Sequence, residues 1–363
     1  MQQLNLKPSH APVKDALCAG TKLAFDPIKV RRSMYRPFTF EWLYFDGLLN
    51  QRQYQQHRIF PMPAAAEENR AICVGGYGRK KFATLIVSKI PDLNFYADPQ
   101  KSFPFYTYAE DGTHRRENIT DWALEQFRSH YHDPSITKWD IFHYIYAVLY
   151  HPEYRERYAA NLRRELPRIP FANATTLNNC HSEPANAGEE SAVLGAGKKQ
   201  IPPSGRNDKP KNAPVTPVPS VVKDHEVFRH LVKAGQRLTE IHVHYEQQPE
   251  YKLATREKAG EKLKWRVTRM RLSKDKTTLI YNDFLTLSDI PKEIYEYRLG
   301  NRSALEWVID QYQVSTDKRS AITNDPNRED DPQYILRLIG QVITVSLETV
   351  KIVQSLPPLL VST

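Results

Sequence analysis

The sequence of 363 residues lacks several features that mark common classes of protein. Its three cysteines, Cys18, Cys73 and Cys180, are too few and too scattered for a disulfide framework or a zinc site. No run of about 18 apolar residues occurs, so we expect no membrane-spanning helix. The first twenty residues are polar and lack the apolar segment of a secretory signal. We therefore expect a cytoplasmic protein that binds no metal ion.

Apolar residues make up 40% of the chain and aromatic residues 11%, which is enough for a sizeable core. The net charge of +9 is concentrated in one place. Residues 252–276 contain ten Lys and Arg against three acidic residues, and the rest of the chain is almost neutral. A concentrated positive charge indicates a polyanion as partner. The alternative is a charged, solvated hairpin without a partner.

Short aromatic or β-branched runs separated by Gly, Pro, Asn and Asp predict strands at residues 38–45, 71–74, 82–88 and 94–96. A helical block is predicted at residues 119–166. The first part of the fold is therefore β-rich and then helical.

The helical block contains a predicted helical hairpin. Thr137 and Asp140 have the spacing of a capping box. Pro152 is suited to the first position of a second helix, which Pro167 ends. The apolar side of this second helix is predicted to bury Tyr154, Tyr158 and Leu162, and its polar side to expose Arg155, Glu156, Arg163 and Arg164.

Residues 173–222 contain seven prolines, four glycines and no aromatic residue. Such a segment buries too little apolar surface to offset the entropy of ordering, so we expect it to be disordered.

A second α+β part follows this segment. Asp224 is predicted to cap an amphipathic helix, and a β-rich piece is predicted at residues 263–285. A short helix at residues 304–311 and a long helix at 331–354 complete the chain. The expected fold class is α+β, because no alternating βαβ pattern occurs. The predicted inward stripe of the first helix is Val227, Phe228, Leu231, Leu238, Ile241 and Tyr245, and that of the last is Ile335, Leu338, Ile339, Val342, Val345 and Val353.

The string WDIFHYIYAVLYHPEYRERYAANLRRELPRIPF at residues 139–171 resembles the C-terminal specificity region of Type ISP restriction–modification enzymes. The likeness continues at residues 35–38 (YRPF), at residues 297–307 (YRLGNRSALEW) and in the run 324–353, in the family's order. Enzymes of this family combine a nuclease, an ATP-driven DNA translocase, an adenine methyltransferase and a target-recognition domain in one chain.

The resemblance covers nearly all of residues 23–356 and lapses at 173–222, which we interpret as an insertion. The domain organisation that it implies is a flexible leader at residues 1–22, a target-recognition domain in two parts at 23–172 and 223–356, an insertion at 173–222, and a tail at 357–363.

Because the family is enzymatic, we searched the chain for its catalytic motifs. The Pro-Pro-aromatic tetrapeptide of adenine methyltransferases and the phosphate loop of helicases are both absent from the sequence. Residues 74–78 (VGGYG) are followed by a predicted strand, so we interpret them as a β-hairpin tip. Pro91-Asp92 is interpreted as a turn, and His242 and His244 point to different helix faces. We expect no catalytic residue, and the resemblance assigns S-adenosylmethionine, ATP and Mg²⁺ to the full-length enzyme only.

The expected DNA contacts are basic residues in three groups. Arg31, Arg32 and Arg36 either touch phosphate or stabilise the joint to a preceding domain. Arg79, Lys80 and Lys81 lie at the glycine-rich tip, where they either enter a DNA groove or form an exposed basic turn. In the basic run, Trp265 and Val267 alternate with cations. This alternation of apolar and cationic residues shifts by one position near residues 268–269, which predicts a strand with a bulge. The third group is Lys264, Arg266, Arg269, Arg271, Lys274 and Lys276.

A further basic group precedes the short helix at residues 304–311. Arg298, Asn301 and Arg302 either position a phosphate at the helix N-terminus or form a cap and its neighbours.

These observations predict a DNA target-recognition module of a Type ISP-like restriction–modification system, without catalytic motifs of its own. The expected partners are double-stranded DNA and a separate methyltransferase/translocase polypeptide. One alternative is a protein-interaction module that docks through the aromatic helical hairpin. Another is the inactive remnant of a broken gene.

Overall fold

The computed structural model describes residues 15–16, 18–22, 24–50, 53–76, 81–173, 224–260, 262, 264–318 and 320–361. Most of the predicted leader, all but the first residue of the predicted insertion, Arg79 and Lys80 lie outside these residues.

Strands and helices alternate irregularly in the first half of the chain. The strands are β1 (Val30–Arg36), β2 (Thr39–Tyr44), β3 (Ala71–Gly75), β4 (Ala83–Val87), β5 (Ile90–Pro91), β6 (Lys101–Pro104), β7 (Tyr106–Thr107), β8 (Arg116–Glu117) and β9 (Ala172–Asn173). The helices are η1 (Pro27–Lys29), α2 (Gln56–Ile59), α3 (Pro63–Glu68), α4 (Asp121–Tyr131), α5 (Lys138–Tyr150), α6 (Pro152–Arg157) and α7 (Ala159–Leu162).

The second half contains the two longest helices. Its helices are α8 (Asp224–Val243), η2 (Tyr245–Gln247), η3 (Lys292–Tyr295), α9 (Ala304–Gln311) and α10 (Tyr334–Gln354). Its strands are β10 (Ala254–Glu257), β11 (Arg271–Leu272), β12 (Leu279–Ile280), β13 (Leu285–Ser288), β14 (Arg298–Leu299), β15 (Arg302–Ser303), β16 (Ser315–Thr316), β17 (Thr323–Asn324) and β18 (Leu360–Val361).

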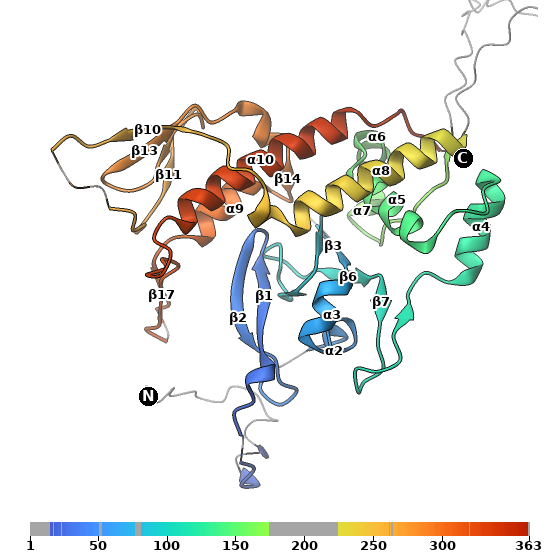
Figure 1. Ribbon diagram of the computed structural model, residues 1–363, viewed down its shortest axis with the longest axis horizontal. Coiled ribbons are helices and arrows are strands. Elements are labelled where there is room, and N and C mark those ends of the chain that lie inside the picture. The colour runs from blue at the N-terminus through green and yellow to red at the C-terminus, as the bar shows by residue number, and fades with distance from the viewer. Residues whose placement is uncertain are drawn as a thin grey trace, which may run out of the picture.

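Helices α8 and α10 run across the molecule in contact with each other, and α5 packs on α8 (Figure 1). The β1–β2 hairpin and the β3 sheet lie on one side of this layer, and the β10–β13 sheet lies at one end (Figure 1). The close approach of α5 and α8 depends on Gly235. A Cβ atom at this position would lie 1.9 Å from the carbonyl oxygen of His143, so only glycine fits.

The sheets are small and mostly antiparallel. β1 pairs with β2 on one side and, in parallel, with β5 on the other, so β2 forms an edge of its sheet. β3 lies between β4 and β6, and β13 lies between β10 and β12. β9 pairs with β18, which joins the middle of the chain to its C-terminal end. The mixture of helices with several small sheets confirms the predicted α+β class.

The core centres on a buried polar chain that we call the aromatic centre: Tyr146, Tyr150, His242, Tyr297 and Thr349. The amide of Ile86 donates to the Tyr146 hydroxyl (3.0 Å), which lies 2.7 Å from His242 Nδ1. His242 Nε2 lies 2.9 Å from the Thr349 hydroxyl, which donates to the Val345 carbonyl (2.7 Å). Every proton in this chain has an acceptor when His242 is neutral and protonated on Nε2.

Most predicted helices form as expected. The capping box of Thr137 and Asp140 starts α5, α9 has the predicted bounds, and the predicted inward stripes of α8 and α10 are buried apart from the half-buried Val353. α8 begins at Asp224 itself, and α10 begins at Tyr334, whose amide donates to the backbone carbonyl of Asp331 in the preceding turn (3.1 Å).

Three predictions of local structure are wrong. Residues 94–96 form a turn, closed by the Ala97 amide donating to Asn94 (2.7 Å), although Phe95 and Tyr96 are buried. The helix predicted after Pro152 breaks at Tyr158 into α6 and α7. Arg155 turns inward, donates to the Leu149 carbonyl (2.6 Å) and stacks on aromatic rings, and desolvation lowers its pKa.

Two absences hold for the described part of the chain. No helix there is both long enough and apolar enough to cross a membrane. No group of three or more His, Cys, Asp or Glu side chains is placed there to hold a metal ion.

Candidate nucleic-acid interface

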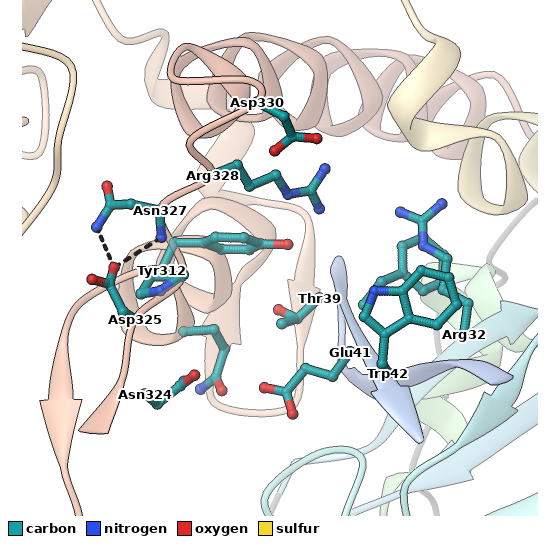
Figure 2. Close-up of a pocket in the computed structure, with 13 residues that line it drawn as sticks. Arg32, Thr39, Glu41, Trp42, Tyr312, Asn324, Asp325, Asn327, Arg328 and Asp330 are labelled. Carbon is teal, nitrogen blue, oxygen red and sulfur yellow. Dashed lines mark hydrogen bonds between the residues drawn. The ribbon is translucent and has the colours of Figure 1, made fainter. Parts of the chain in front are cut away.

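A cleft of about 710 Å³ lies between the edge strand β2 and the segment that follows β17 (Figure 2). Its walls carry acidic, basic, amide and aromatic side chains, whereas the core is mostly apolar. The lining residues are Arg32, Thr39, Phe40, Glu41, Trp42, Gln311, Tyr312, Asn324, Asp325, Pro326, Asn327, Arg328 and Asp330.

The first wall of the cleft is the β1–β2 hairpin. Its antiparallel register places Arg32 opposite Trp42 and Ser33 opposite Glu41. Because the cleft runs along the outer edge of β2, side chains from both faces of that strand line it. Trp42 is 75% exposed, so its indole ring is open to solvent on this wall.

Arg32 is held firmly on this wall. Its Nη2 atom donates to both carboxylate oxygens of Glu246 (2.8 and 2.9 Å), and its guanidinium lies 4.1 Å from the centre of the Phe40 ring. Glu246 also accepts from the Tyr334 hydroxyl (2.7 Å), which ties the hairpin to α10. The guanidinium is therefore positioned by two neighbours, Glu246 and Phe40, before any ligand arrives.

The opposite wall comes from the C-terminal end of α9 and residues 324–330. Asp325 Oδ1 accepts from the amide of Asn327 (3.1 Å) and from its Nδ2 atom (2.7 Å), which closes a tight turn (Figure 2). Arg328 stacks 3.2 Å above the ring centre of Tyr334. Tyr312 is buried behind this wall, with its hydroxyl 3.2 Å from that of Tyr334.

The basic segment, which we define as residues 264–276, is fastened beside the cleft by two asparagine side chains. Asn327 Oδ1 accepts from the Val267 amide (2.7 Å), and Asn327 Nδ2 donates to the Val267 carbonyl (2.8 Å). Asn282 Nδ2 donates to the carbonyls of Lys264 (2.6 Å) and Arg266 (3.1 Å). Amide side chains thus bond to backbone groups that, in a sheet, would pair with a neighbouring strand.

The predicted strand in the basic segment does not form, since regular pairing begins only at Arg271. The predicted division of its side chains is correct in part, since Trp265 and Leu272 are only half-buried. Val267 and Met270 are buried. The predicted cations that are exposed are Lys264, Arg266, Arg269, Arg271 and Lys274.

Two of these predicted cations already have partners. Arg266 forms a salt bridge with Asp325 and lines a second pocket of about 450 Å³ together with Asn327 and Arg328. Lys276 is half-buried in a turn and donates to Glu306 Oε1 (2.7 Å). The second pocket shares Asp325, Asn327 and Arg328 with the cleft, so Arg266 stands at the cleft's edge.

In the N-terminal group only Arg32 lines the cleft. Arg31 is 7% exposed, its guanidinium donates to the carbonyls of Phe60 and Pro61 (3.4 Å each), and desolvation lowers its pKa. Arg36 Nη1 donates to Asp92 Oδ1 (2.7 Å) and to the Tyr35 carbonyl (2.7 Å).

The glycine-rich tip lies elsewhere. β3 and β4 pair as an antiparallel hairpin, as predicted, and Gly76 leaves β3 with φ +99°. A Cβ there would lie 2.4 Å from the Lys81 carbonyl oxygen, so the turn requires glycine. Lys81 lines a separate pocket of about 160 Å³, and Arg79 and Lys80 lie outside the described residues.

The residues before α9 act as a cap and its neighbours. Ser303 and Glu306 form a capping box that satisfies the first amides of the helix. Arg302 pairs with Asp310 (2.9 Å) and stacks on Trp307. Arg298 donates to the Asn301 carbonyl.

Sequence reasoning missed most of the cleft. Glu41 and Trp42 were part of a predicted strand but had no assigned role. Asn324, Asp325 and Asn327 belong to a block that carries the family likeness, and only this likeness singles them out. Because a turn-forming string such as Asn-Asp-Pro-Asn predicts a loop and nothing more, its side-chain contacts could not be foreseen.

Solved structures of restriction enzymes match the fold. One is the ATP-dependent Type ISP restriction–modification enzyme LlaBIII bound to DNA, at 27% identity and a TM-score of 0.74. Another is a nuclease-deletion mutant of the Type ISP enzyme LlaGI in complex with a DNA substrate mimic, at 30% identity and a TM-score of 0.69. A third is a cryo-electron microscopy structure of a DrdV–DNA complex, at 29% identity and a TM-score of 0.73.

These matches cover 97%, 96% and 99% of this chain, which spans 20%, 27% and 31% of the respective relatives. No curated protein matches the sequence significantly. The family model described as the Type ISP C-terminal specificity domain matches residues 5–214 and 211–338. Its match begins within the predicted leader, and its two parts meet inside the predicted insertion. The chain therefore belongs to the Type ISP C-terminal specificity domain family.

Proposed function

We propose that this chain recognises a specific DNA site on behalf of a restriction–modification system. The observation that carries this proposal is the convergence of Arg32 and Arg266. These residues are more than 200 positions apart in the sequence, yet they line adjoining pockets that share Asp325, Asn327 and Arg328. The DNA complexes among the similar structures support the same partner.

The basic segment and the cleft suit different parts of DNA. Exposed cations along the basic segment can neutralise phosphates, and phosphate contacts set position and affinity. The cleft mixes acidic, amide and basic side chains, which are the groups that hydrogen-bond to base edges in the major groove. The basic segment thus positions the duplex while the cleft reads it.

We further propose that the catalytic work belongs to other domains. In this proposal an adenine-N6 methyltransferase and an ATP-dependent endonuclease, on the same or a separate polypeptide, bind S-adenosylmethionine, ATP and Mg²⁺. The purified chain is then expected to transfer no methyl group and to hydrolyse no ATP. Adenine methylation of plasmid DNA by the pure chain would contradict this division.

The alternative of protein docking through the aromatic hairpin finds no support in the fold. Tyr144 and Tyr146 have no exposed surface, and Tyr154 is 1% exposed. Their rings pack against β4, α8 and residues 168–171, and their hydroxyls have internal partners. A partner could reach them only by opening the core.

The test is the salt dependence of duplex binding, measured by fluorescence anisotropy. If about five cations meet phosphates, log affinity falls with log salt with a slope of roughly −4 to −5. Changing Lys264, Arg266, Arg269 and Arg271 together to Gln is expected to weaken binding to all duplexes and to flatten the slope by about 3 to 4.

A control variant removes the same number of charges elsewhere. Arg157, Arg163, Arg164 and Lys351 are exposed and do not line the cleft or the adjoining pocket, so changing them to Gln should leave the slope unchanged. A folded quadruple variant of the basic segment that keeps wild-type affinity and slope would contradict the proposal.

A further inference from the structure

Glu41 places a carboxylate in the cleft at a point where the protein does not use it. Among the described residues, its side chain makes no hydrogen bond and no salt bridge, whereas Asp325 is engaged by Asn327 and Arg266. The cation that acts on it electrostatically is Arg36, which already donates to Asp92. Figure 2 shows the Glu41 side chain reaching into the space between β2 and Asn324.

The position of Glu41 is set by regular structure. It lies on β2 opposite Ser33, whose hydroxyl donates to the Glu41 carbonyl (3.2 Å). β1 is held in turn by β5 on its far side. Asp330, the other cleft carboxylate without a described partner, lies on an irregular segment before α10. Glu41 is therefore the carboxylate that the fold positions most firmly.

A carboxylate at a DNA surface discriminates between the chemical groups of the duplex. It repels phosphate oxygens and the carbonyl acceptors of guanine and thymine, and it accepts hydrogen bonds from exocyclic amino groups. Desolvation raises the pKa of Glu41, with smaller and opposing effects from Arg36 and Asp92, and the residue remains exposed to solvent. An amino donor would stabilise the charged carboxylate, whereas a phosphate would repel it.

We propose that Glu41 selects a base with an exocyclic amino group, cytosine N4 or adenine N6, in the major groove of the bound duplex. This inference rests on the proposed function and names one residue responsible for its specificity. Trp42, its exposed neighbour, forms the adjacent rim of the cleft and faces the duplex with it.

The experiment selects duplexes from a library with a randomised centre, using the full chain. Wild type is expected to enrich a motif that contains one position restricted to cytosine or to adenine, and the enriched base tells the two apart. Glu41→Gln is expected to lose about tenfold discrimination at that position and to keep the others, because one good base contact contributes this much. Glu41→Asp should retain part of the preference.

The matched control is Glu110→Gln on the turn between β7 and β8, an exposed glutamate that does not line the cleft. It should enrich the wild-type motif. Thermal unfolding of each variant shows whether the fold is intact.

The outcomes separate this inference from the proposed function. A wild-type chain that binds duplexes without enriching any motif would overturn both. If Glu41→Gln enriches the wild-type motif and merely binds every duplex more tightly, Glu41 only repels phosphate. That result would overturn the role of Glu41 and leave target recognition standing.

Discussion

The aromatic centre and the cleft both combine aromatic and polar side chains, but their polar groups have different partners. In the aromatic centre, Tyr146, His242 and Thr349 bond to one another and to backbone groups within the fold. In the cleft, Glu41 has no bonding partner among the described residues, and Trp42 is mostly exposed. Buried polar groups must be satisfied internally, whereas polar groups in an open cleft are available to a ligand. The comparison therefore separates residues that maintain the fold from residues that are available to a ligand.

The largest expected effect is on the aromatic centre. His242→Leu removes the acceptor of Tyr146 and the donor to Thr349 and leaves both hydroxyls buried. We expect a loss of about 3 kcal/mol in the free energy of unfolding, because each unsatisfied buried group costs about 1–3 kcal/mol. Urea denaturation measures the loss. The enriched DNA motif should not change, and a changed motif would show that the two regions are coupled.

The pH dependence of stability gives the second effect. Burial lowers the pKa of His242 to about 3, so the folded protein stays unprotonated there while the unfolded chain takes up a proton below about pH 6.5. Stability therefore falls as the pH decreases through this window, by about 2 kcal/mol between pH 6.5 and 5 for this one group.

Burial also lowers the pKa of His143, to about 4, which adds a loss in the same direction. Measuring the free energy of unfolding at several pH values in wild type and in His242→Leu gives the contribution of His242 to the pH dependence. Equal slopes in the two proteins would mean that His242 is protonated in the folded state, contrary to the hydrogen-bond pattern.

The third effect concerns the basic segment beside the cleft. Asn327→Ala removes both hydrogen bonds to the backbone of Val267. We expect a loss of about 1 kcal/mol in stability, faster hydrogen exchange at the Val267 amide and weaker DNA binding. Asn324→Ala is the control for stability and exchange, since its side chain makes no described bond to the basic segment. Unchanged exchange in Asn327→Ala would mean that the segment holds its shape without the amide.

The smallest loss of stability is expected from shortening the chain between β9 and α8. Deleting residues 176–219 should cost no stability and should raise the free energy of unfolding by no more than about 2 kcal/mol, because each halving of a loop lowers the cost of closing it by only about 0.6 kcal/mol. Limited proteolysis is expected to cut wild type first in this segment and leave two associated fragments. If the deletion variant fails to fold, the segment predicted to be an insertion has a structural role.

Local patterns predicted most of the helices correctly. The capping residues of α5 and the apolar stripes of α8 and α10 depend on residues a few positions apart, so a single sequence contains them. The aromatic run before β9 likewise predicted a packed hairpin.

The cleft could not be predicted in the same way, because its walls come from segments far apart in the chain. The pairing of Arg32 with Glu246 and of Asn327 with Val267 depends on how the sheets and helices assemble. The alternation at residues 264–267 predicted that Val267 is buried and that Lys264 and Arg266 are exposed, but not that asparagine amides would replace a neighbouring strand. Arg31 was included with Arg32 because both are basic, and only the fold shows that it faces inward.

Tyr131 marks a place where another protein can be inserted into the chain. Its hydroxyl accepts from the Ala172 amide (2.9 Å) and lies 3.2 Å from the Ala172 carbonyl oxygen, and its ring stacks on Phe228 with centroids 4.5 Å apart. One side chain thus brings together the chain just before residue 174 and the start of α8. A fluorescent protein whose own termini lie close together could be grafted between these points without straining the helices. Such a fusion would make single molecules visible by fluorescence as they bind and leave DNA, while leaving the cleft unobstructed.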